Sequence, residues 1–397
     1  MHFDPRQTII AGVLVLFLGK YLNRRIPVLR RYNIPEPVTG GLVASLFFGL
    51  LYLLFGVEVT FSTHYRDILL VVFFTAIGLS TEMKSIIRGG KVLLLFTLFA
   101  VGYIFLQNYL GIVIARFFGL APATGILAGS AALQGGHGNI VSWAPILSEK
   151  HSVANAMEIG MLSATFGLII GGILGGPVAR YLIRRYRLQA GSGEELTIGT
   201  KHGENLTIDY YSILTILLML ALSIGIGLYL HDLLDKVHFT LPLFATCMLG
   251  GVLLAWLAPL VIPKLGCLPH SPTLRIANDL SLGLFLAMAM MSLKFWELGT
   301  EALFILVSIV AQTAAILLFS VFLLFRVMGK NYDAAVLTAG YIGSAMGATP
   351  TAMANMAAVT KEHGPSPIAF AVIPIVGAFI IQVSNAVVIN IMLMWIG

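Results

Sequence analysis

Charge is what this sequence of 397 residues lacks: 11% of it is charged, whereas 58% is hydrophobic. An average soluble domain is about 25% charged and about 45–50% apolar. The polar surface is too small to cover a water-soluble globule, which excludes a soluble enzyme, a nucleic-acid-binding protein and a disordered scaffold. Together with a mean hydropathy of +0.92, the shortage of charge predicts an all-α polytopic membrane protein embedded in a lipid bilayer.

Cysteine is also scarce. Cys247 and Cys267 are too few for a disulfide framework or a cysteine metal site, and we expect no organic cofactor and no nucleic-acid partner. Asp4 precedes the first apolar run and no small-residue cleavage site follows, so this run is interpreted as the first span and not as a signal peptide. The net charge of +6 is typical of the basic cytoplasmic loops of membrane proteins.

Ten charge-free stretches predict membrane-spanning helices, because a span needs about 20 apolar residues. They are Thr8–Gly19, Pro37–Val57, Ile68–Thr81, Val92–Ala115 and Ile159–Ala179 in the first half, and Tyr210–Leu230, Leu241–Pro263, Leu280–Leu293, Ala302–Phe325 and Pro365–Ile396 in the second. Two further apolar segments, Phe117–Ser148 and Ala334–Thr360, are interrupted by Gly, Pro and small polar residues. We expect re-entrant or broken helices there, within residues 121–150 and 333–362, because irregular backbone at membrane depth must be buried by protein or reached by water.

The basic residues predict the orientation. Lys and Arg cluster in the loops that hold Arg24, Arg88 and Arg185, and the alternate loops are poor in them. Since basic loops stay in the cytoplasm, both termini are expected to be extracytoplasmic. The polar stretch 188–209 then forms a cytoplasmic linker between the two halves.

The two halves resemble each other at a spacing between about 205 and 212 residues. Pro37 matches Pro242, and Gly136 matches Gly347. Five spans per half is an odd number, so residues 1–187 and 210–397 are predicted to form two inverted-topology repeats. Inverted repeats that each contain a broken helix are typical of secondary transporters, whose substrate lies where the broken segments meet.

The interruptions themselves supply candidate ligands. Three of the four residues 135–138 are Gly, which disfavours a continuous helix. Pro350 suits the first turn of a new helix and Thr349 its N-cap, so we expect a half-helix to begin near residues 349–351. Helix N-termini bind anions, and unwound carbonyls and hydroxyls suit Na⁺. An alternative is that these glycines serve only close helix packing.

Candidate substrate ligands are Ser130, Gln134, Gly135, Gly136, His137, Gly138, Asn139, Gly347, Ala348, Thr349, Pro350, Thr351 and Asp279. Candidate Na⁺ ligands are Ser344, Gly347, Thr349, Asn139 and Glu82. His137 could bind substrate, titrate in a proton relay or bond a carbonyl at a turn. Asp279 and Glu82 bound short charge-free stretches and could accept an ammonium group or a cation, or be solvated helix ends.

The sequence resembles those of the bacterial sodium/glutamate symporter family. The resemblance is carried by IPEPVTGGL (Ile34–Leu42), AGSAALQGGHGNI (Ala128–Ile140) and GATPTAMANM (Gly347–Met356), and it extends over essentially the whole chain. It implies an inner-membrane symporter that takes up L-glutamate with Na⁺ as the coupling ion, through re-entrant loops that meet at the site. It further implies a homodimer in which a transport part moves as an elevator against a scaffold.

The sequence is compatible with three alternatives. The same architecture could carry another small carboxylate, such as a dicarboxylate, or the protein could be a passive channel. A Ser/His hydrolase would need His137 within hydrogen-bond reach of Ser130 or Ser142. No GxSxG-like context accompanies either serine, so the sequence favours a carrier and not an enzyme.

Overall fold

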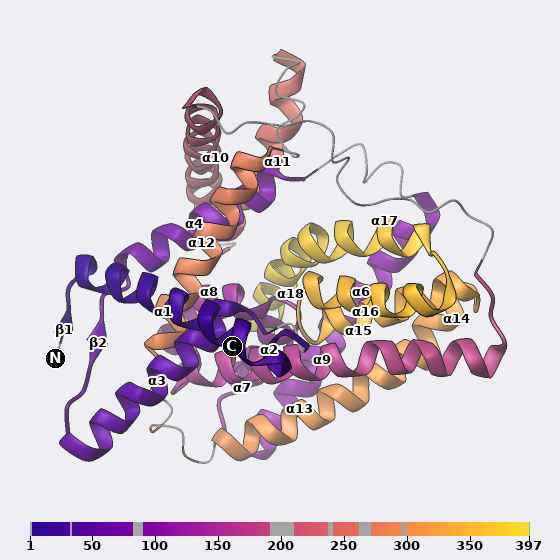
Figure 1. The fold of residues 1–397 in the computed structure, drawn as a ribbon, viewed down its shortest axis with the longest axis horizontal. Helices are drawn as coiled ribbons and strands as arrows, with labels where there is room; N and C mark the ends of the chain where they lie inside the picture. Colours follow the sequence, from indigo (N-terminus) through magenta and orange to yellow (C-terminus); the bar gives the residue numbers. More distant parts are fainter. Residues whose placement is uncertain are drawn as a thin grey trace. The chain divides into compact units, whose positions relative to one another are not determined.

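Each of the ten stretches predicted to span overlaps a helix in the computed structural model (Figure 1). The structure describes residues 2–31, 34–81, 90–190, 210–236, 241–261, 271–294, 296, 299 and 301–396. Six of the described helical stretches are long and apolar enough to cross a membrane, and Leu243–Pro259 and Ile381–Ile396 are shorter apolar helices. The polytopic helical class is therefore confirmed.

The elements follow one another in this order. They are β1 (His2–Phe3), α1 (Pro5–Arg25), α2 (Pro27–Arg31), α3 (Glu36–Phe55), β2 (Thr60–Phe61), α4 (His64–Leu79), α6 (Gly90–Phe117), α7 (Pro122–Ile126), the π-helical segment η1 (Leu127–Ala131), α8 (Gly136–His151), α9 (Ala156–Tyr186), α10 (Tyr210–Lys236), α11 (Leu243–Val261), α12 (Pro272–Met291), α13 (Glu301–Leu318), the π-helical η4 (Phe319–Leu324), α14 (Phe325–Val327), α15 (Tyr332–Ala345), α16 (Thr349–His363), α17 (Pro367–Ile375), the π-helical η5 (Val376–Ile380) and α18 (Ile381–Ile396).

Helix α1 shows how the sequence sets the ends of a helix. The Asp4 side chain accepts from the backbone N–H of Gln7, and the Gln7 side chain accepts from the Asp4 N–H, which forms a capping box. Pro5 occupies the first helical position, where its missing N–H costs nothing. The helix ends at Arg25, whose charge favours the negative C-terminal end.

The chain divides into two compact units, and each draws on both halves of the sequence. Unit 1 contains Met1–Met83 and Asn205–Gly299, and unit 2 contains Lys84–Glu204 and Thr300–Gly397. Helices α1, α3, α4 and α6 precede the broken segment of the first half, and α10, α11, α12 and α13 precede that of the second. The predicted repeat boundaries at 187 and 210 stay a prediction.

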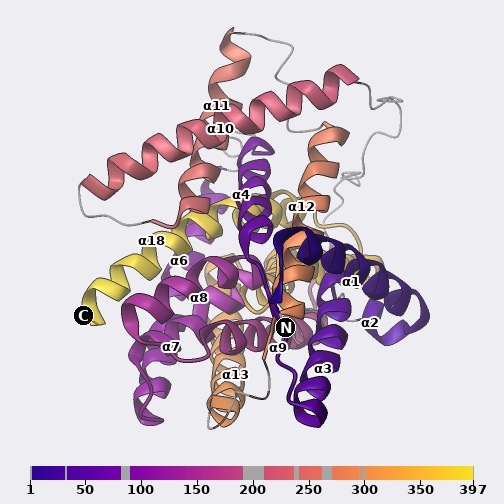
Figure 2. The ribbon, with the colours of Figure 1, turned by 90° about the vertical axis from the view of Figure 1, so that its left-hand side faces the viewer.

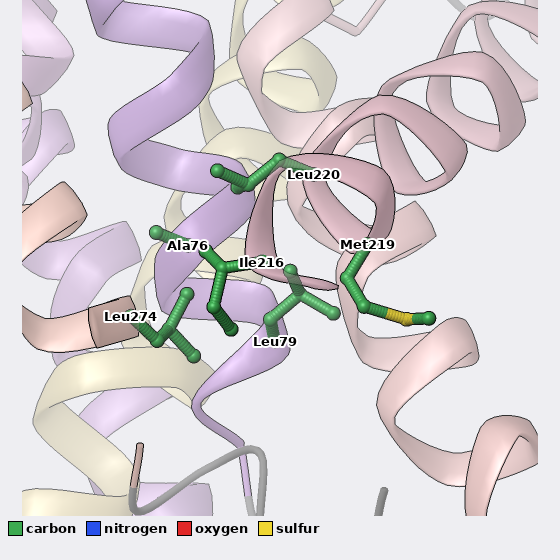
Figure 3. Packing of buried hydrophobic residues seen from close by; sticks show 6 residues of the cluster. All are labelled: Ala76, Leu79, Ile216, Met219, Leu220 and Leu274. Carbon is green, nitrogen blue, oxygen red and sulfur yellow. The ribbon is translucent and has the colours of Figure 1, made fainter. Parts of the chain in front are cut away.

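Unit 1 is built around α4, which packs against α10, α11 and α12 (Figures 1 and 2). Figure 3 shows one cluster of this core, in which Ala76 and Leu79 of α4 meet Ile216, Met219 and Leu220 of α10 and Leu274 of α12. A Cβ on Gly251 of α11 would lie 2.7 Å from the carbonyl oxygen of Thr75. Glycine therefore allows these two helices to approach closely, as in other membrane proteins.

An ion pair and an aromatic stack join the segment after α12 to α3 and the loop that follows it, within unit 1. Lys294 Nζ lies 2.6 Å from Glu58 Oε1, and the Tyr52 and Trp296 rings stack with centroids 5.2 Å apart. The hydrogen bond from Lys294 and its positive charge lower the pKa of the Glu58 carboxyl below its ordinary value of 4.5.

Unit 2 contains both predicted broken segments. Helix α6 packs against α7, α13 and α18, whereas α9 packs against α8, α15 and α16. The first broken segment is the run α7, η1 and α8, and the second is α15 and α16. The π-helical segments η1, η4 and η5 of the described residues lie in this unit, and such segments are frequent at functional sites.

Candidate functional site: two interrupted helices

The first interruption falls at the predicted glycines. The helical path bends at Gly129, whose φ of −94° and ψ of −126° are not helical, and α8 starts afresh at Gly136. Gly136 has a φ of +69°, in the left-handed region where a Cβ is disfavoured. Pro145 lies inside α8 without ending it.

The second interruption separates α15 from α16 at residues 346–348, and α16 begins at Thr349 as predicted. The predicted N-cap is wrong by one residue. Ala348 is the N-cap, with an extended φ of −159°, because its carbonyl accepts the first helical hydrogen bond, from Ala352 N–H at 3.0 Å. Thr349 and Pro350 therefore fill the first turn, and the Thr349 hydroxyl is not used as a cap.

The two interruptions meet. A Cβ on Gly136 would lie 3.7 Å from the carbonyl oxygen of Gly347. Helix α9 packs on both at Gly167, where a Cβ would lie 2.5 Å from Leu133 Cδ2 and 2.5 Å from the Met346 carbonyl oxygen. The structure thus brings together the two motifs that sequence reasoning had paired by their spacing.

Ser130 is fully engaged in holding the first broken segment. Its Oγ donates to Asn385 Oδ1 at 2.5 Å, Asn385 Nδ2 donates to its carbonyl at 3.0 Å, and its N–H donates to Asn108 Oδ1 at 2.9 Å. These bonds satisfy backbone groups near the Gly129 bend, as burial requires. Ser130 therefore positions the segment.

The contacts of His137 fix its tautomer. Its Nε2 lies 3.0 Å from Thr165 Oγ1, and that hydroxyl already donates its hydrogen to the Met161 carbonyl at 2.8 Å. The imidazole must then carry its hydrogen on Nε2 and donate it to Thr165, which leaves Nδ1 as an acceptor. With His137 on Thr165 and Ser130 on Asn385, neither contact has the geometry of a Ser/His nucleophile.

Several predicted ligands present oxygen atoms near the interruptions. A Cβ on Gly377 of η5 would lie 2.9 Å from Thr349 Oγ1 and 3.2 Å from Ser344 Oγ, so both hydroxyls border the same point. Asn139 donates from Nδ2 to Gln382 Oε1 at 3.1 Å. Its Oδ1 and the Oγ1 of Thr351 are buried and accept no hydrogen bond, so they are available to a cation or a donor.

The remaining predicted ligands differ in their surroundings. Gly135 is the N-cap of α8, where a Cβ would lie 2.6 Å from the Ala131 carbonyl, and Gly138 follows in its first turn. Pro350 is exposed. Asp279 is an exposed residue of α12 and belongs to unit 1. Glu82 lies outside the described residues.

Sequence reasoning missed the amide side chains that hold the site. They are Gln107 and Asn108 on α6, Gln312 on α13, Asn355 on α16, and Gln382 and Asn385 on α18. Each interrupts an otherwise apolar stretch, and this is the signal that could have found them, because polar groups inside a membrane are expensive and face protein or water.

Comparison with known proteins decides the family. The family model for sodium/glutamate symporters matches residues 1–365. The chain belongs to the sodium/glutamate symporter family. Sodium/glutamate symporters from Escherichia coli K12 and Shigella flexneri are each 40% identical to it over 397 residues, 99% of this chain and 98% of theirs. The one from Haemophilus influenzae is 37% identical over 394 residues, 98% of this chain and 97% of its own. As a member of a symporter family, the protein is a transporter and not an enzyme.

Proposed function

We propose that this protein couples Na⁺ entry to the uptake of L-glutamate across the bacterial inner membrane. The observation that carries the proposal is the meeting of two interrupted helices at Gly136 and Gly347 in a chain of this family. Interrupted helices near the midplane are how secondary transporters expose helix ends and free carbonyls to substrate and ion.

The helix ends suit the carboxylates of glutamate. Helix α16 starts at the interruption with Thr349 and Pro350 in its first turn, and α8 starts there with Gly136. The first N–H groups of a helix have no partner within it, and together with the macrodipole they attract anions. In this proposal the two starts receive the two carboxylates, and acceptors such as His137 Nδ1 receive the α-ammonium group.

The oxygen atoms suit the coupling ion. Glutamate carries one net negative charge, which is costly to move through a low-dielectric region. Neutral oxygen ligands lie near the two interruptions: the hydroxyls of Ser344 and Thr349, Asn139 Oδ1 and the Gly347 carbonyl. Such oxygens replace the hydration shell of an alkali cation. Each net positive charge that moves inward gains about 2.3 kcal/mol per 100 mV.

We place unit 2, which holds both interruptions, in the moving part of an elevator-type carrier and unit 1 in the scaffold of a homodimer. The two halves would be inverted repeats with re-entrant segments, supported by the long helices that precede each broken segment and by Gln107 and Gln312, buried amides on α6 and α13. Both termini would be extracytoplasmic. Asp279 and Glu82 stay predictions.

The deciding experiment is uptake of radiolabelled L-glutamate into proteoliposomes with and without an imposed Na⁺ gradient. We expect concentrative uptake only with the gradient, and faster uptake with an inside-negative potential when more than one Na⁺ accompanies each glutamate. Uptake that stays downhill without Na⁺ would indicate a channel. Stronger competition by dicarboxylates than by unlabelled glutamate would indicate a carrier of another carboxylate.

The orientation has a separate test. Single cysteines placed at Arg24 and Arg185 are expected to resist a membrane-impermeant thiol reagent in intact cells, because basic loops face the cytoplasm. Both should react after the membrane is permeabilised. Efficient labelling of both in intact cells would reverse the proposed topology.

A further inference from the structure

Gln107 is a fully buried amide on α6. Its Nε2 lies 3.2 Å from the carbonyl oxygen of Ala345, at the end of α15. A carbonyl oxygen can only accept, so the amide nitrogen must point toward Ala345 and the amide oxygen away from it. Gln107 Oε1 in turn lies 2.8 Å from Gln134 Nε2, which must donate to it.

This chain of hydrogen bonds leaves two amide oxygens without a donor. Because Gln134 uses its nitrogen on Gln107, it presents Oε1. Gln312 on α13 donates from Nε2 to the backbone carbonyl of Gln107 at 2.7 Å, so it also presents Oε1. Both oxygens are buried and accept no hydrogen bond. Rotating any of the three amide groups by 180° would place its oxygen against another oxygen. The carbonyls of Ala345 and Gln107 therefore determine that Gln134 and Gln312 each leave Oε1 without a donor.

A third oxygen lies on the same side of α13. Ser308 precedes Gln312 by four residues, and residues so spaced share one face of a helix. Both side chains are fully buried, and Ser308 Oγ has no hydrogen-bond partner. Helix α13 packs against α6, which carries Gln107, and against η1, the segment that leads to Gln134. Gln134 and Gln312 are thus both bonded to Gln107, and Ser308 shares a helix face with Gln312.

These oxygens have the chemistry of an alkali-cation site. Buried acceptors without donors are costly, and a cation compensates all of them at once. Two carboxamide oxygens and a hydroxyl are hard, neutral ligands, whereas Ca²⁺ and Mg²⁺ are held by sites that include carboxylates. We propose that Gln134, Ser308 and Gln312 bind a Na⁺ ion, with Gln107 as the residue that positions both amides.

The location gives this ion a part in coupling, which rests on the proposed function. Gln107 is bonded to Gln134, at the first interruption, and to Ala345, immediately before the second. A cation on Gln134 orders the amide chain that connects the two, so Na⁺ binding favours the arrangement in which the two interruptions meet. Glutamate then binds a site that Na⁺ has prepared.

The test measures Na⁺ binding to the purified full-length protein without glutamate. The readouts are ²²Na⁺ binding and the rise of Tm with NaCl, at ionic strength held constant with choline chloride. The variants are Ser308→Ala and Gln312→Leu. The matched control is Ser320→Ala, since Ser320 is another buried serine without a hydrogen-bond partner. It lies eight residues beyond Gln312, which corresponds to about 12 Å of helix.

We expect both variants to weaken Na⁺ binding at least about tenfold, because each loses a bond to a charged group. The Ser320→Ala variant should bind Na⁺ like the wild type. Ser308→Ala removes a hydroxyl that makes no hydrogen bond, so it keeps the test decisive even if Gln312→Leu fails to fold.

Two results would overturn the site. One is wild-type Na⁺ affinity in folded Ser308→Ala, which would mean that the oxygens hold only water. The other is the absence of Na⁺-dependent stabilisation in the wild type. Uptake assays separate this inference from the proposed function: Na⁺-coupled uptake with unchanged Na⁺ affinity in the variants removes only the site. Weakened Na⁺ binding with Na⁺-independent uptake removes only the proposed function.

Discussion

Replacing Gly136 tests whether its backbone conformation holds the tip together. Its φ of +69° is left-handed, and a Cβ there has room, since the nearest atom is the Gly347 carbonyl oxygen at 3.7 Å. The penalty for Gly136→Ala is therefore conformational, roughly 1–2 kcal/mol. Gly136→Asn should cost less, because asparagine tolerates this region by bonding locally.

Gly347 provides a crossed control because its constraint is different. It has no positive φ, but a Cβ would lie 3.0 Å from the Gly343 carbonyl and 3.2 Å from Leu168 Cα. Space is what limits this position, so Gly347→Ala should be tolerated better than the larger Gly347→Asn. The order of the two substitutions is thus expected to invert between the positions.

The assay is glutamate affinity and Tm of each purified variant in saturating Na⁺. If glutamate binds only when residue 136 is in the left-handed conformation, a strain of about 1–2 kcal/mol lowers the population of that conformation roughly 5–30-fold. The apparent Kd for glutamate then rises by the same factor. We expect that rise for Gly136→Ala and a smaller one for Gly136→Asn. Equal affinities for Gly136→Ala, Gly136→Asn and the wild type would refute the argument from φ.

Two further predictions concern hydrogen bonds and charge. Asn385→Ala should lower the free energy of unfolding by about 1–3 kcal/mol, because buried groups of Ser130 lose their partner. Thermal unfolding measures this loss. Ser130→Ala should destabilise the Asn385→Ala variant by less than it destabilises the wild type. The lowered pKa of Glu58 means that its pair with Lys294 stabilises the protein above pH 4.5 and stops doing so as the pH falls through the lowered value. Glu58→Gln should remove this part of the acid dependence of Tm, and an unchanged pH profile would contradict it.

The fold class and the places of the helices followed from the sequence because lipid imposes a simple rule. A charge-free stretch of sufficient length must satisfy its backbone internally, and a helix does so. The ends were less predictable. Helix α9 runs from Ala156 to Tyr186, past Arg180, because a basic residue near a C-terminus is favourable and does not stop a helix.

The site was predictable only where the backbone departs from a helix. Runs of glycine and a proline signal such departures, so the interruptions near Gly136 and Thr349 were found. The partners of the tips were not, because a single amide such as Asn385 has no local consequence for secondary structure. Its role comes from a hydrogen bond to Ser130, which lies far away in the sequence. Such a distant pairing leaves no periodic pattern from which it could be predicted.

The composition of unit 1 bears on how the chain is made. Helix α4 ends at Leu79, and its partner α11 begins at Leu243, about 160 residues later. At a synthesis rate of about 5–20 residues per second, roughly 10–30 s pass between them. During that interval the α4 face around Thr75 and Gly78, which will receive α11, stays in the membrane without its partner. Unit 1 therefore cannot be completed until the second half has been synthesised. Biogenesis factors that shield unpaired helices would bind the nascent protein at this face of α4.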